Sequence, residues 1–198
     1  MSRHWLMLAI PALALAACSP SENEPATSPS APPSQVEASA DPDSTLSPRP
    51  TSDTNADGDF TITVTVPASR VTTATEITPV ASFGYVGPLD SAVVFHGSPL
   101  VYWSIHEVDG RRAMTGGVDT VCIETTLTKG TGFSQDFMKS GEISEDPATG
   151  FELAWFRQPL LRLPAGRWDI TATLDLTLDE CGGERHQIAA NVEVEVSR

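Results

Sequence analysis

Two cysteines and a histidine in the second half of the chain have side chains of the types that bind soft metals. Cys122, Cys181 and His186 are of the types found in blue-copper centres, which use two histidines, one cysteine and a weak axial methionine. No methionine follows Cys181, because the last one in the chain is Met138. The same thiols can also form a disulfide, so the choice depends on the redox compartment.

A second set of candidate ligands lies in residues 53–60, where oxygen-bearing side chains occupy alternate positions. Asp53, Asn55 and Asp57, followed by a glycine, match the start of an EF-hand calcium loop. The twelfth position, which should be a bidentate Glu, is Val64. We therefore expect a turn-rich joint here, with a calcium site on these three residues as the alternative.

The sequence lacks the common catalytic motifs. It contains no G-x-S-x-G elbow, no S-x-x-K and no glycine-rich loop before a helix. His106 and Glu107 are not followed by the second histidine of a zinc protease motif. His96 and His106 are expected at opposite ends of one strand, too far apart to share a metal. We expect a non-enzymatic protein without a cofactor.

The N-terminal residues predict an export signal. Residues 1–17 combine a charged lead with about twelve apolar residues, the pattern of a secretory signal peptide. Leu15, Ala16, Ala17 and Cys18 resemble the bacterial lipobox. This resemblance implies that a diacylglycerol is attached to the Cys18 thiol and that the chain is cut before this residue. Two or more acyl chains, such as palmitate, anchor a protein stably, so we expect attachment to the cell membrane or outer membrane on the exported side.

A tether is expected between this anchor and a folded domain. Residues 18–58 are rich in Pro and Ser and contain no aromatic residue. Such a segment cannot bury enough apolar surface to offset its ordering entropy, so disorder is predicted. About forty flexible residues would reach roughly 35 Å.

Export also bears on the cysteines. Once Cys18 is lipidated, Cys122 and Cys181 remain as an even pair in an oxidising setting, which favours a disulfide. A metal site on these two thiols and His186 stays as the alternative. We expect Cys181 in the turn of the last hairpin. Val121, Ile123 and Leu127 should face the core.

Residues 59–198 are predicted to form one all-β domain, an antiparallel immunoglobulin-like β-sandwich of about eight or nine strands. The segments 60–66, 167–180 and 186–196 alternate apolar and polar residues, which is typical of strands with one face in water. The closing pair, "LPAGRWDITATLDL" and "IAANVEVEV", resembles the last hairpin of many bacterial immunoglobulin-like domains. Further strands are expected at 70–78, 91–96, 100–108, 111–115, 118–127 and 151–156, and one short helical turn within 132–140.

The charge balance bears on possible partners. Residues 59–198 contain 19 acidic residues and 10 Lys or Arg, a net charge of −9, which disfavours nucleic acid and anionic lipid as ligands of the domain. Trp103, Trp155 and Trp168 are expected in the core. Tyr102 and Phe156 have outward parity and are candidates for an exposed contact patch.

These observations together predict a lipid-anchored cell-envelope protein that presents a β-sandwich as a binding or interaction module. An accessory or solute-binding lipoprotein of an envelope complex is the first alternative, and a copper carrier is the second. Its partner would be an envelope protein or ligand.

Overall fold

The computed structural model describes residues 49–140 and 150–198. This part of the chain contains eleven strands and one short helix, α1 (Gly150–Arg157). The strands are β1 (Thr51–Ala56), β2 (Phe60–Val66), β3 (Arg70–Thr72), β4 (Val80–Tyr85), β5 (Ser91–Ser98), β6 (Val101–Glu107), β7 (Ala113–Thr115), β8 (Asp119–Thr128), β9 (Gly132–Asp136), β10 (Gly166–Leu176) and β11 (His186–Ser197).

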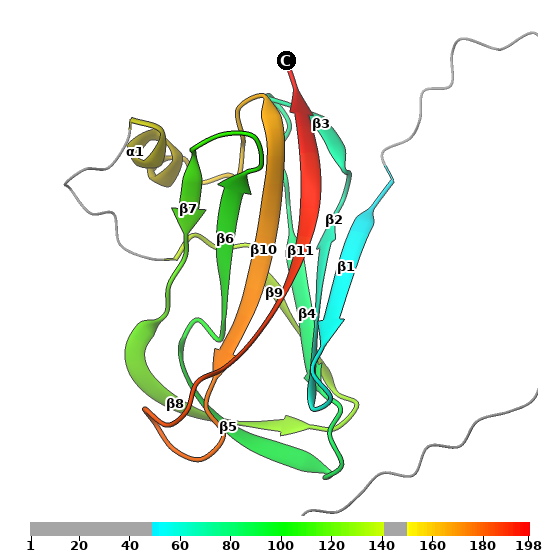
Figure 1. Cartoon of the computed structure of the whole chain (residues 1–198), viewed down its shortest axis with the longest axis vertical. Coiled ribbons are helices and arrows are strands. Elements are labelled where there is room, and N and C mark those ends of the chain that lie inside the picture. Colours follow the sequence, from blue (N-terminus) through cyan, green and yellow to red (C-terminus); the bar gives the residue numbers. More distant parts are fainter. Residues whose placement is uncertain (1–48, 141–149) are drawn as a thin grey trace, which may run out of the picture. The chain divides into compact units, whose positions relative to one another are not determined.

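The strands form two larger sheets and one ribbon (Figure 1). One sheet has the order β1-β2-β4-β9 and the other has the order β3-β11-β10-β6-β7. The ribbon consists of β5 and β8 alone and lies at the lower end in this view. Strand pairs are antiparallel except for the short parallel contact between β3 and β11. The predicted all-β, sandwich-like fold is confirmed.

A single apolar core lies between the two larger sheets. Phe60, Ile62, Val64 and Val66 alternate with threonines along β2, and all four are buried in this core. Alternation works here because successive side chains of a strand point to opposite faces of its sheet. The three predicted core tryptophans, Trp103, Trp155 and Trp168, are buried in the same core.

The polar face of β10 differs from the prediction at its second half. Thr173, Asp175 and Thr177 were expected to face water, but each is less than a tenth exposed. This strand is central in its sheet, between β11 and β6, and its end is bridged to Phe95 of β5. The ribbon and the chain around it therefore bury the polar side chains on this face of β10.

The segment predicted as a strand at 151–156 is a helix, so that prediction was wrong. Helix α1 has Glu152 in its first turn and Arg157 in its last, which suits the helix dipole. Pro159 follows two residues after its end and prevents continuation. Phe151 and Trp155 lie four residues apart and so share one side of the helix.

The folded domain also begins before the predicted boundary at residue 59. Strand β1 pairs with β2 from Thr51 opposite Val66 to Ala56 opposite Thr61, so disorder up to residue 58 was wrong for this segment. The two strands are joined by a tight turn in which Gly58 has a φ of 102°, a conformation that favours glycine. Residues 18–48 of the predicted tether lie outside the described residues.

Three smaller differences concern β3, β4 and β9. Strand β3 covers only three residues of the predicted strand 70–78. Strand β4 was not predicted, and Gly84 weakens its apolar pattern. Strand β9 lies where a helical turn was predicted, and its Phe133 stacks on Phe83 of β4 at a ring separation of 5.6 Å. No helix in the described part is long and apolar enough to cross a membrane.

Candidate functional site

One end of the domain concentrates the exposed apolar side chains. We call this the ribbon end and define it as residues 86–98, 117–130 and 175–185, which comprise β5, β8, the segment leading into β5 and the turn after β10. Among the described residues, eight large apolar side chains are exposed, and six of them belong to the ribbon end. These six are Val86, Leu89, Val93, Val121, Ile123 and Leu178. Neighbouring exposed apolar side chains, such as Val121 and Ile123 two positions apart on β8, are typical of interaction surfaces.

Only part of the ribbon packs against the core. Val94 of β5 and Leu127 of β8 are fully buried and close the end of the sandwich. Towards its beginning, β8 extends past this core, so Val121 and Ile123 are 52% and 39% exposed. Leu127 faces the core as predicted, whereas the prediction that Val121 and Ile123 do so was wrong.

An irregularity in strand pairing lies at the same place. The register of β5 and β8 shifts between His96, opposite Ile123, and Ser98, opposite Asp119. A Cβ atom at Gly97 would lie 2.3 Å from the backbone oxygen of Asp119, so only glycine fits this close approach. Such a bulge bends the strand that contains it and increases its local twist.

The ribbon is held to the turn after β10 by a disulfide. Cys122 and Cys181 are bonded, with Cα atoms 5.9 Å apart. Cys181 lies in the final turn, as predicted, and this turn also has a hydrogen bond from the Thr177 hydroxyl to the Glu180 carbonyl. The disulfide prediction is confirmed, and it leaves neither sulfur available as a thiolate ligand for copper.

A hollow of about 600 Å³ lies behind this disulfide, between the beginning of β8 and the end of β10. Its wall contains a charged pair that the sequence did not reveal: the Asp175 side chain is only 5% exposed and forms a bidentate pair with Arg185. The hydrogen bonds that Arg185 donates to the Asp175 carboxylate raise the pKa of Arg185 above its ordinary value. His96 also lines the hollow, and its Nε2 is 2.8 Å from the Thr125 hydroxyl.

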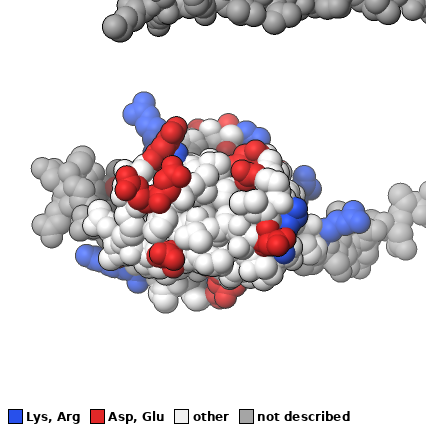
Figure 2. All heavy atoms as spheres, turned by 90° about the horizontal axis from the view of Figure 1, so that it is seen from below, with Lys and Arg blue, Asp and Glu red and all other residues white. Residues whose placement is uncertain are grey.

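The ribbon end is strongly acidic. It contains seven acidic residues but only two basic ones, Lys129 and Arg185. Within the described part of the chain, six of these acids form no salt bridge. They are Asp90, Asp119, Glu124, Asp179, Glu180 and Glu184. Figure 2 shows the domain from below, with acidic side chains spread around a central area of uncharged surface.

The residues of the calcium hypothesis serve the fold instead. Asp53 accepts a hydrogen bond from the backbone N–H of Asn191, and the Asn55 side chain donates one to the Ala189 carbonyl. Asp57 accepts from the N–H groups of residues 59 and 60 in the turn between β1 and β2. The EF-hand pattern therefore coincides with a hairpin turn and with side chains that bind the edge of β11.

Asp57 also pairs with His186, the third residue of the copper alternative. Burial acts to raise the pKa of Asp57, but the hydrogen bonds from the turn and the contact with His186 outweigh it and lower the pKa below its ordinary value. Among the described residues, no group of three or more His, Cys, Asp or Glu side chains lies close enough to hold a metal ion.

The two residues of the predicted contact patch, Tyr102 and Phe156, are both only partly exposed and lie on different elements. Tyr102 is half-buried on β6, where its hydroxyl is 3.5 Å from the amide nitrogen of Gln187. Phe156 is on α1, packs against the core and contacts Trp155 edge to face. His106 is exposed on β6, away from His96 on β5.

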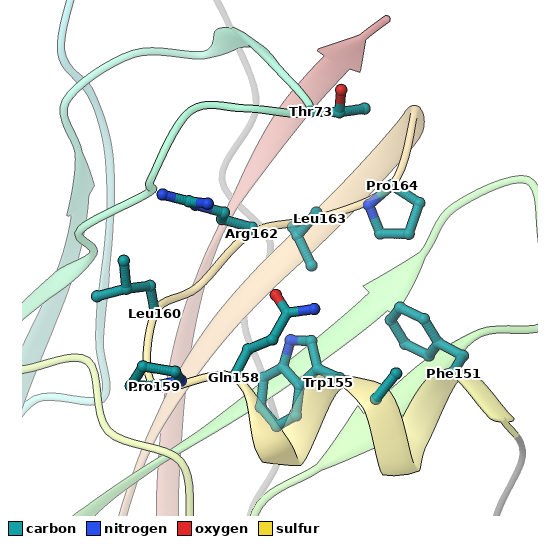
Figure 3. A pocket seen from close by; sticks show the side chains of 10 residues that line it. Thr73, Phe151, Trp155, Gln158, Pro159, Leu160, Arg162, Leu163 and Pro164 are labelled. Carbon is teal, nitrogen blue, oxygen red and sulfur yellow. The ribbon is translucent and has the colours of Figure 1, made fainter.

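A second hollow, of about 630 Å³, lies beside α1. Phe151 and Trp155 of the helix point into it from one side, and Leu163 and Pro164 of the segment before β10 line another (Figure 3). Lys139 donates to the carbonyls of Trp155 and Gln158 and so caps the end of α1. Burial lowers the pKa of Lys139 below its ordinary value.

Comparisons with protein-family models, with curated proteins and with solved structures found no match for this chain. The fold and the ribbon end are therefore interpreted from their own chemistry. Cys18, the predicted lipidation site, lies outside the described residues.

Proposed function

We propose that this chain is an exported lipoprotein that holds a β-sandwich binding module at a cell-envelope membrane through a lipid on Cys18. The module is non-enzymatic and contacts an envelope protein through its ribbon end. The observation that carries this proposal is the concentration of exposed apolar side chains and unpaired acids at that end. Surfaces that combine exposed apolar side chains with charged ones are common at protein interfaces.

Two further features support an exported location. Leu15, Ala16, Ala17 and Cys18 form the lipobox-like sequence described above. The disulfide between Cys122 and Cys181 is of a kind that persists in oxidising compartments and is rare in the cytosol. The cysteines cannot serve a copper carrier while they are bonded to each other.

A solute-binding role is the second candidate, and the hollow beside α1 favours it. Its aromatic and proline lining, with Arg162 as the one cation among the described lining residues, suits a small apolar ligand with a polar group. Titration of the purified chain with such ligands, followed by Trp155 fluorescence, distinguishes this role from protein binding.

The anchor is tested by expressing the full chain in a bacterium and separating membrane and soluble fractions. The wild-type protein should enter the membrane fraction, and its N-terminal peptide should carry a diacylglycerol on Cys18 by mass spectrometry. Cys18→Ser should be released or left unprocessed, because a hydroxyl does not replace the lipidated thiol. A soluble wild-type protein cut at another residue would refute the anchor.

A further inference from the structure

The proposed contact surface contains an unpaired strand edge. Strand β8 pairs with β5 on one side, and no described strand pairs with its other edge. Two-stranded ribbons are marginal without a third strand or a packed face. In this domain the ribbon depends on the buried Val94 and Leu127, on the bridge between Phe95 and Thr177, and on the disulfide.

The register identifies which backbone groups face the open edge. The Phe95 N–H donates to the Thr177 carbonyl at 2.9 Å, and the Thr177 N–H donates to the Phe95 carbonyl at 2.8 Å, so the backbone groups of Phe95 point away from β8. Phe95 lies opposite Glu124. In an antiparallel pair without mutual hydrogen bonds, both residues point their N–H and C=O groups outwards. Glu124, and by alternation Thr126, therefore direct a donor and an acceptor to the open edge.

The edge lacks two of the protections that natural proteins use against strand addition. Natural proteins guard such edges with lysine or proline, and neither occurs in β8. Its side chains are instead threonines, apolar residues and two acids, Asp119 and Glu124. Most of the strand, from Asp119 to Glu124, is exposed. This combination provides an open template for another extended chain.

Charge determines which chain fits. Two copies of this domain paired through β8 would bring two sets of seven acids together, against two basic residues in each. A segment with Lys or Arg would instead meet the unpaired carboxylates around the ribbon. Its apolar side chains would meet the exposed Val121 and Ile123.

We propose that β8 accepts an extended segment of a partner protein, containing Lys or Arg alternating with apolar residues, as the third strand of the β5–β8 sheet. This inference rests on the proposed function, because it specifies how the ribbon end binds. Main-chain hydrogen bonds supply part of the affinity in such strand addition, and side-chain contacts supply the specificity.

The test uses the full chain and a synthetic peptide of about nine residues in which Val alternates with Lys and Thr. Saturable binding is expected by calorimetry. Replacing Lys by Glu in the peptide, or methylating the backbone nitrogens on one edge, should weaken binding by about tenfold or more. Equal binding of the N-methylated peptide would overturn the proposal.

On the protein side, Thr126→Pro removes the outward N–H without breaking a ladder bond to β5, since proline is tolerated at such edge positions. It should weaken peptide binding by about tenfold, whereas the matched control Thr126→Ala should stay within about twofold. Circular dichroism checks that Thr126→Pro is folded. If this variant does not fold, binding of the N-methylated peptide to the wild-type chain tests the proposal instead. Unchanged binding by a folded Thr126→Pro variant would overturn the proposal.

Failure of the inference differs from failure of the proposed function. If no basic peptide binds but cross-linking at Val121 still captures one specific envelope protein, strand addition is wrong and the binding module stands. If both fail, the proposed function fails too. Reversible dimerisation that Thr126→Pro abolishes would overturn the basic partner in favour of a second copy of this chain.

Discussion

Arg112 connects the turn between β6 and β7 to α1 and β10. Its guanidinium pairs with the Glu107 carboxylate, with Nε 2.8 Å from Oε2. The same group lies 4.8 Å from the ring centre of Trp168 and 5.5 Å from that of Phe151. The hydrogen bond from Arg112 outweighs burial and lowers the pKa of Glu107 below its ordinary value of 4.5.

The first prediction concerns this pair. Glu107→Gln should lower the free energy of unfolding by about 1–2 kcal/mol at pH 7, because a charged hydrogen bond in a largely covered site is lost. A lowered carboxylate pKa stabilises the fold above the unfolded pKa, and this stabilisation is lost as the pH falls through the folded pKa. The difference between the two proteins should therefore shrink below about pH 4.5.

Urea unfolding at several pH values measures this difference. Glu195→Gln is the matched control, since Glu195 forms an exposed pair with Arg70 and should contribute little. A constant difference between wild type and Glu107→Gln from pH 7 to about pH 3 would contradict the role assigned to the charged pair.

At the scale of elements, the disulfide joins β8 to the turn after β10. The two cysteines are 59 residues apart in sequence. Replacing both, as in Cys122→Ala with Cys181→Ala, should lower the free energy of unfolding by about 2–4 kcal/mol, because the unfolded chain regains the freedom of a long loop. Hydrogen exchange should rise first in β8, and equal protection of β8 in both proteins would show that the ribbon does not depend on this bond.

Strand β1 supports another element through side chains. Asp53 and Asn55 bind backbone groups on the edge of β11 that faces away from β10. Asp53→Ala should speed exchange of the Asn191 amide and cost about 0.5–1.5 kcal/mol, the range for one hydrogen bond. Thr54→Ala is the matched control, because Thr54 bonds only to Thr63 across β1 and β2. An Asn191 amide that exchanges at the wild-type rate in Asp53→Ala would contradict this role.

The elements show where sequence periodicity is sufficient. Strands β2 and β11 were predicted well because strict alternation is enforced by one buried face. The same alternation located β10, although both faces of its second half are buried. Helix α1 was mistaken for a strand. Its eight residues include clustered aromatic side chains, and over so short a length their spacing fits both the two-residue period of a strand and the 3.6-residue period of a helix. Strand β1 was missed because nearly all of its side chains are polar and exposed, and its support comes from pairing with β2.

At the scale of the whole molecule, the sequence predicted the disulfide but not the surface around it. The prediction of a disulfide follows from the even number of cysteines that remain after Cys18, so it does not depend on correct strand assignment. The exposure of Val121 and Ile123 depends instead on how far β8 extends past the core, which alternation does not encode. The acid-rich ribbon end likewise joins three segments that are distant in sequence.

The central claim is that the ribbon end binds an envelope protein, and site-specific photo-cross-linking in cells tests it most directly. A benzophenone side chain is introduced in the full chain at Val121, at Leu178, or at Ser82, an exposed control on β4 outside the ribbon end. Irradiation should give one adduct of the same mass from Val121 and Leu178 and none from Ser82. No adduct from Val121 and Leu178, or the same adduct from all three positions, would contradict the account.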